Sequence, residues 1–104
     1  MAPRAATPVE SPSALAAKLR DAAARGRTGE LKRLLAKGAP VDMPDDDGET
    51  ALMRSIRANQ PATAALLRRH GASLDLKNGA GESARDMATS IDDAKLNRAL
   101  GLDG

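Results

Sequence analysis

The chain has 104 residues, which is room for one small domain, and it contains no Phe, Tyr, Trp or Cys. The lack of cysteine excludes a disulfide framework and a thiolate zinc site, and the lack of aromatic side chains predicts a small core and a low stability. A net charge of +2, from 16 basic and 14 acidic residues, describes a mixed surface, so we do not expect nucleic acid as the main partner. The start of the chain lacks the apolar run of a signal peptide, and no segment is as apolar as a membrane span, so we expect a cytoplasmic location without a membrane.

The first helix is predicted to follow an N-terminal tail. Residues 1–12 are rich in Ala, Pro, Thr and Ser without periodicity, so we expect a disordered tail or linker. Ser11 or Ser13 can cap a helix that Pro12 helps to start. Gly26 is expected to end this helix in the left-handed conformation.

A second helix and a loop come next. Thr28 is expected to cap the helix, Gly38 to end it, and Pro40 prevents it from continuing. Leucines at helical spacing give the helix an apolar face: Leu31, Leu34 and Leu35. Residues 41–48 then predict a turn or an extended finger.

The following segment predicts the same alternation of helices. Thr50 is expected to cap a third helix, and Asn59 tolerates the left-handed conformation that stops it. Pro61 suits the first turn of a fourth helix over residues 62–70, which Gly71 closes.

A second finger and two short helices complete the chain. Residues 73–81 predict the finger, and Ser83 with Asp86 is similar to a capping box that has Asp in place of Glu or Gln. The last helices are expected at about 84–90 and 93–100. Residues 101–104 are expected to fray.

Glycines recur at a fixed interval. Gly38 and Gly71 are 33 residues apart, and the same interval separates Gly48 from Gly81. A constant period of this length is typical of a solenoid in which helical units stack on their neighbours. The usual role of such an array is to hold a partner.

Four segments resemble a known family. Residues 45–53 (DDDGETALM) resemble the opening D-x-x-G-x-T-P-L-H of an ankyrin repeat, and residues 78–86 (NGAGESARD) repeat this opening in degraded form. Residues 66–75 (LLRRHGASLD) are similar to the L-L-x-x-x-G-A-x-V-N/D close of the repeat, and residues 34–42 (LLAKGAPVD) match this close with a difference of one residue. The chain is therefore identified as similar to ankyrin-repeat proteins of a short, bacterial type.

The resemblance implies an all-α ankyrin-repeat helical solenoid with short β-turn or finger loops. Its repeat domain would cover residues 13–100 in two and a half to three repeats, at about 13–44, 45–77 and 78–100. Met53 stands where the family often has His, and Arg85 stands where it has a core Leu. Residues 17–20 lack the Thr-Pro start. We therefore expect one well-formed repeat between two polar-faced caps.

Two features could carry chemistry. The acidic run Asp45–Glu49 is dense, but an EF-hand calcium loop would need Asp where Met43 stands and Glu where Arg54 stands. His70 is the only histidine, and no other residue lies at a spacing that predicts catalysis or metal binding with it. We expect His70 to lie at a helix end or to contact a partner. The sequence thus predicts no enzyme, no cofactor and no metal site.

By resemblance, the chain is a protein–protein interaction module that presents a rigid concave surface to a partner protein or peptide, with a regulatory or inhibitory outcome left open. We expect it to be a monomer on its own. The alternative is a nucleic-acid-binding accessory domain that uses the basic residues and binds with a steep salt dependence. The implied partner-binding residues lie on the fingers and the inner helices: Asp46, Asp47, Glu49, Arg57, His70, Lys77 and Glu82.

Overall fold

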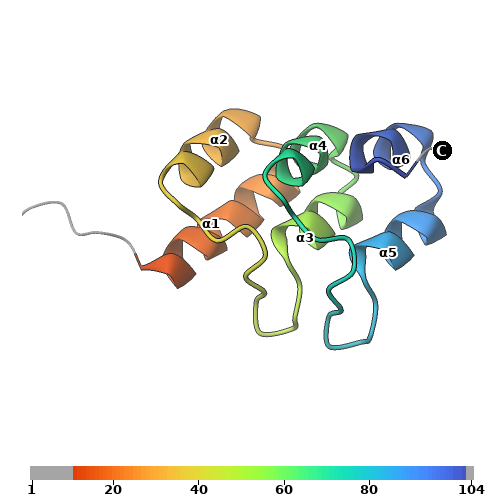
Figure 1. Ribbon diagram of the computed structural model, residues 1–104, viewed down its shortest axis with the longest axis horizontal. Coiled ribbons are helices and arrows are strands. Elements are labelled where there is room, and N and C mark those ends of the chain that lie inside the picture. Colours follow the sequence, from red (N-terminus) through yellow and green to blue (C-terminus); the bar gives the residue numbers. More distant parts are fainter. Residues whose placement is uncertain (1–10, 103–104) are drawn as a thin grey trace, which may run out of the picture.

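The computed structural model describes residues 11–102, and within them six helices stack in two layers (Figure 1). The inner layer consists of α1 (Pro12–Arg25), α3 (Ala51–Arg57) and α5 (Ala84–Ile91). The outer layer consists of α2 (Thr28–Ala36), α4 (Pro61–Arg69) and α6 (Ala94–Leu100). Each inner helix packs on the outer helix that follows it, and consecutive inner helices pack on each other, as expected for an all-α solenoid.

Two loops connect the outer helices to the inner helices that follow them. The first finger (residues 41–48) and the second finger (residues 73–81) project side by side beyond the inner layer (Figure 1). In residues 11–102, the β-structure is limited to one isolated bridge between Lys77 and Ser83. The predicted fold class is therefore confirmed.

Side-chain oxygens cap the start of each inner helix. Ser11, rather than Ser13, accepts a hydrogen bond from the amide three residues further on, and Thr50 does the same for α3. Ser83 and Asp86 form the predicted capping box, with 3.1 Å between side-chain oxygen and amide nitrogen in both directions. These bonds satisfy amides that the first helical turn leaves without partners.

Thr28 does not cap α2, so that prediction was wrong. Thr28 is the first residue of the helix, and Arg27 precedes it without a side-chain cap. The reason lies in the end of α1, where Gly26 has φ 72° and the Arg27 amide donates to the Ala22 carbonyl at 3.0 Å. Only Gly26 and Arg27 separate the two helices, so Arg27 takes the N-cap position and Thr28 is already helical.

The C-terminal end of the described chain is attached to the domain. Gly101 ends α6 in the left-handed conformation, and the Leu102 amide donates to the Asn97 carbonyl at 2.8 Å. Leu102 also packs against the core, so the expectation of fraying does not apply to these two residues. Residues 103–104 and most of the predicted tail (1–10) lie outside the described residues, while Ser11 and Pro12 belong to the start of α1.

The core fills the space between the two layers and runs through all three helix pairs. Its fully buried large apolar side chains are Leu19, Leu31, Leu52, Met53, Ile56, Leu67, Leu96 and Leu100. Each such side chain contributes about 1.5–3 kcal/mol by leaving water. Arg85 is exposed, as expected for a terminal cap. No helix within residues 11–102 is long and apolar enough to cross a membrane.

Candidate partner-binding site

Two side chains at equivalent positions of consecutive repeats, Asp45 and Asn78, stabilise the turns of the two fingers. Asp45 Oδ1 accepts hydrogen bonds from the amides of Asp47 at 2.8 Å and Glu49 at 3.0 Å. Asn78 Oδ1 makes the same pair of bonds, at 2.9 and 3.0 Å, to the amides two and four residues further on. Such bonds give the turn a local partner for amides that would otherwise need water. Both fingers therefore have a fixed shape.

The two fingers are also joined to each other. The Gly79 amide donates to the Asp47 carbonyl at 2.8 Å. Gly48 makes this approach possible, because a Cβ atom at its position would lie 2.8 Å from the Gly79 nitrogen. Gly48 also has φ 79°, in the left-handed region. The fingers form one paired edge.

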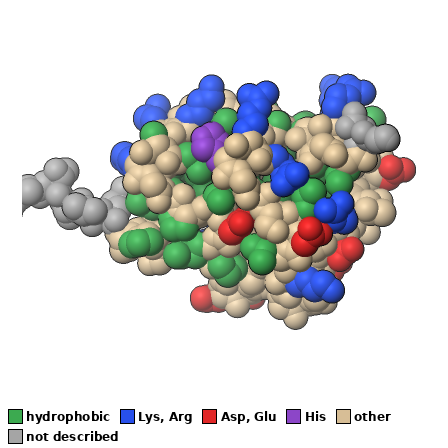
Figure 2. Space-filling model, in the orientation of Figure 1, with side chains coloured by type: hydrophobic (Ala, Val, Ile, Leu, Met, Phe, Trp, Pro, Cys, Tyr) green, Lys and Arg blue, Asp and Glu red, His purple; other side chains and the backbone are tan. Residues whose placement is uncertain are grey.

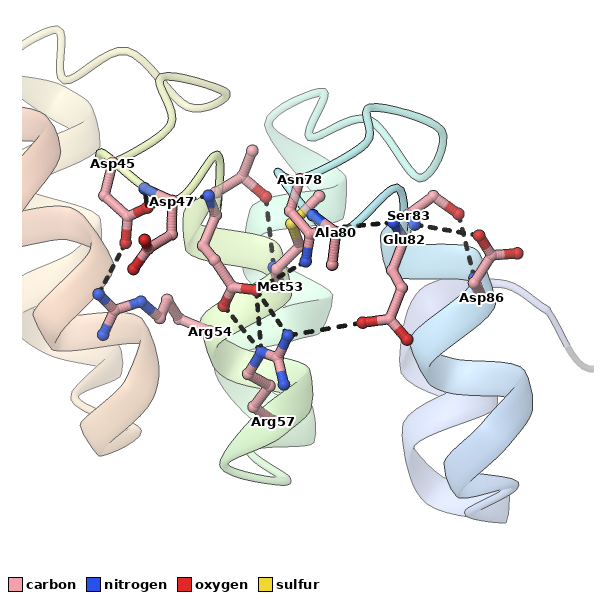
Figure 3. A network of polar contacts seen from close by, with 12 residues as sticks. Asp45, Asp47, Met53, Arg54, Arg57, Asn78, Ala80, Glu82, Ser83 and Asp86 are labelled. Atoms are coloured by element: carbon pink, nitrogen blue, oxygen red, sulfur yellow. Dashed lines mark hydrogen bonds and ion pairs between the residues drawn. The ribbon is translucent and has the colours of Figure 1, made fainter.

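Arg57, on α3, links the bases of the two fingers (Figure 3). Its guanidinium donates to both carboxylate oxygens of Glu49 at 2.7–3.0 Å, and its Nη2 lies 3.7 Å from Glu82 Oε1. Asn78 Nδ2 adds a hydrogen bond to Glu49 Oε2 at 2.9 Å. The Glu49 side chain is 11% exposed, whereas that of Glu82 is 50% exposed. Glu49 thus lies at the centre of the network.

A second ion pair holds the first finger against α3. Asp45 Oδ2 accepts a hydrogen bond from Arg54 Nη2 at 2.8 Å. Burial raises the pKa of Asp45, but the hydrogen bonds from Arg54 and from the Glu49 and Asp47 amides outweigh burial and lower its pKa to about 2. For Glu49, the hydrogen bonds from Arg57 are the largest influence and lower the pKa against the effect of burial, with help from Asn78. Both carboxylates are ionised at neutral pH.

The tip of the first finger carries two further carboxylates. Asp46 and Asp47 are exposed, and within residues 11–102 their carboxylates form no hydrogen bond or ion pair. They line an open hollow of about 700 Å³ between the two fingers and α3, together with Arg54 and Arg57. At the base of the hollow the charged side chains are paired with one another, whereas the two carboxylates at its rim have no partner among the described residues.

The structure brings five of the seven predicted site residues to this edge. Glu49, Arg57 and Glu82 are in contact, and Asp46 and Asp47 lie beside them. The prediction took Glu49 as a contact residue, but its carboxylate is occupied by Arg57 and Asn78, so we assign it to positioning the network.

The remaining two predicted residues lie apart. Lys77 is exposed on the second finger, where its backbone pairs with Ser83. His70 ends α4 in the outer layer, where its Nδ1 lies 3.0 Å from the Leu66 carbonyl oxygen. Neither forms a hydrogen bond or ion pair with the other predicted residues.

Three residues of the network were not predicted from the sequence: Asp45, Arg54 and Asn78. Two of them could have been found from the repeat period, because Asp45 and Asn78 are 33 residues apart and each stands at the start of a finger turn. No group of three His, Asp or Glu side chains in residues 11–102 is placed to hold a metal ion.

The two layers, the 33-residue recurrence and the paired fingers define a short helical-repeat scaffold. Residues 19–68 match the family model described as ankyrin repeats (many copies). The chain is an ankyrin-repeat protein. No curated protein matches it. Ankyrin repeats are generally protein–protein interaction modules and are typically non-enzymatic.

Proposed function

We propose that the chain binds a basic segment of a partner protein, or a basic peptide, through the edge formed by its two fingers. One observation carries the proposal. The carboxylates of Asp46 and Asp47 have no partner among the described residues, whereas the nearby cations Arg54 and Arg57 are already paired with carboxylates. Lys77 is the only cation in the two fingers, so the charge that this edge offers to a partner is negative on balance.

The fixed geometry of the fingers favours binding. Side-chain bonds from Asp45 and Asn78 fold each finger, and the bond from Gly79 to Asp47 joins the two. A loop that is ordered before it binds loses little conformational entropy in the complex. Because the contacts are between exposed charges, the affinity should fall as the salt concentration rises.

The test is a double substitution, Asp46→Asn with Asp47→Asn, which removes two negative charges and keeps the side-chain shapes. Binding of a fluorescein-labelled peptide rich in Lys and Arg is followed by fluorescence anisotropy at low salt. We expect the affinity to fall by about tenfold or more.

The matched control carries Asp21→Asn with Asp92→Asn, which makes the same change in net charge at exposed positions away from the fingers. It should retain most of the affinity. Equal weakening by both double variants would mean that net charge, rather than the finger edge, attracts the peptide, and the proposal would fail.

A further inference from the structure

The outer layer presents a surface of the opposite sign to the finger edge. Lys and Arg side chains follow the edge formed by α2, α4 and α6 in Figure 2, where the single His also lies. We call this surface the outer basic face, and it consists of Lys32, Arg33, Lys37, Arg68, Arg69, Lys95 and Arg98. Within the three outer helices the only carboxylate is that of Glu30, and it lies 3.8 Å from Arg27.

Cations on the two sides of the molecule differ in their pairing. On the inner side, Arg54, Arg57 and Arg85 each form an ion pair with a carboxylate at 2.7–2.9 Å. On the outer basic face, five exposed cations form no ion pair within residues 11–102: Lys32, Arg33, Lys37, Arg69 and Lys95. The net charge of +2 conceals this separation, because the negative finger edge and the positive outer face nearly cancel.

A hollow of about 410 Å³ opens in this face between the C-terminal ends of α4 and α6. Arg68, Arg69 and Arg98 line it, and Ala65, Ala99 and Leu100 supply apolar surface between them. Among residues 11–102, no carboxylate lines the hollow.

Hydrogen bonds to neutral backbone carbonyls hold the Arg68 guanidinium in place. Its Nε donates to the Leu100 carbonyl at 3.1 Å, and its Nη1 donates to the Ala72 carbonyl at 2.7 Å. These partners are neutral, so they fix the guanidinium without pairing it with a carboxylate. Its charge acts on Asp75 only at longer range, where it helps to lower the pKa of that carboxyl. Arg69 stands next to it, exposed and without an ion pair to any other described residue. A guanidinium that is already positioned binds a carboxylate with less loss of side-chain entropy.

We propose that this hollow and the outer basic face around it form a second docking surface, which takes an acidic segment of a partner protein. A Glu or Asp side chain offers a carboxylate for the arginines and methylene groups for the alanine surface between them. A nucleic-acid strand fits less well, because the chain has no aromatic side chain on which bases could stack. A membrane surface also fits less well, because the two exposed large hydrophobic residues within 11–102, Leu76 and Ile91, lie outside the outer helices.

The test uses the full chain and a fluorescein-labelled peptide of alternating Glu and Ala, followed by fluorescence anisotropy at low salt. Arg69→Glu should weaken binding by about tenfold or more, and Arg69→Lys should restore most of the affinity. Lys77→Glu makes the same change in net charge on the second finger and should have little effect. The double variant Asp46→Asn with Asp47→Asn should also bind the peptide normally, which separates this surface from the finger edge.

Three results would overturn the proposal. The first is no binding of the acidic peptide at low salt. The second is equal weakening by Arg69→Glu and Lys77→Glu, because the attraction would then depend on net charge alone. The third is tighter binding, sensitive to Arg69→Glu, of a duplex DNA oligomer or of phosphatidylserine vesicles, which would make the occupant a nucleic acid or a membrane. Circular dichroism of each variant checks that the helices remain folded.

Discussion

The carboxylates of Glu49 and Glu82, which occupy equivalent positions in consecutive repeats, share the guanidinium of Arg57. The sharing is unequal: Arg57 donates to Glu49 at 2.7–3.0 Å and lies 3.7 Å from Glu82. Since Glu49 is largely buried, it depends on this pairing, whereas Glu82 keeps half of its side chain in water. One arginine thus supports the finger edge across the junction between two repeats.

Arg57→Ala should therefore lower the free energy of unfolding by about 1.5–3 kcal/mol, because it leaves a buried carboxylate with Asn78 as its remaining side-chain partner. Arg85→Ala is the matched control. Arg85 pairs with Asp75, whose side chain is 72% exposed, so water screens the pair and its loss should cost far less stability than the loss of Arg57. Urea unfolding of both variants measures the difference. Equal losses would show that burial of Glu49 does not decide the strength of the pair.

Gly48 and Gly81 form a second matched pair. Both have left-handed backbone angles, with φ 79° and 82°. A Cβ atom at Gly48 would meet the backbone of Asn78 and Gly79 at 2.8–2.9 Å, whereas a Cβ at Gly81 would meet no atom within 4 Å. Gly81→Ala should cost about 1–2 kcal/mol for the conformation alone.

Gly48→Ala should cost about 1–3 kcal/mol more than Gly81→Ala, because the fingers would have to separate. Urea unfolding again gives both values. If the two substitutions cost the same, the close contact between the fingers would not contribute to stability.

The sequence predicted those parts of the fold that depend on local signals. The beginnings and ends of helices depend on residues close together in the chain. The structure shows the expected side-chain cap at Ser83 and the expected left-handed backbone angle at Asn59. Thr28 was predicted wrongly because its role depends on how α1 ends, and the two-residue turn after α1 places Arg27, not Thr28, at the N-cap of α2.

The site was predicted less completely, because its contacts join residues that are distant in the chain. The Asn78 side chain reaches Glu49, 29 residues away, and the Gly79 amide reaches the Asp47 carbonyl. The repeat period places Glu49 and Glu82 at equivalent positions, but it cannot show that Arg57 lies between them. His70 is the opposite case: a noticeable residue in the sequence that the fold places in the outer layer, away from the fingers.

Acid should weaken the domain through the same network. The pKa of Asp45 is lowered from 3.8 to about 2, and that of Glu49 is also lowered. Because the unfolded chain binds protons more readily than the folded one, this stabilisation is present above the unfolded pKa values and is lost as the pH falls through the folded ones. For Asp45 it is on the order of 2 kcal/mol.

Urea unfolding at a series of pH values from about 6 down to about 2 measures this loss. Asp45→Asn keeps an oxygen for the finger amides but removes the charge that pairs with Arg54. It should be less stable than the original chain at pH 6 and should lose less stability on acidification. An unchanged pH dependence in this variant would mean that Asp45 is not one of the groups responsible.

The most direct test of the finger-binding account is a map of where a basic peptide binds. Backbone amide signals of the full chain are recorded by heteronuclear NMR while an unlabelled peptide rich in Lys and Arg is added. The account predicts that the largest shift changes fall on residues 45–49 and 78–82, and that Asp46→Asn with Asp47→Asn greatly reduces them. Changes centred on α2, α4 and α6, or no changes at low salt, would contradict it.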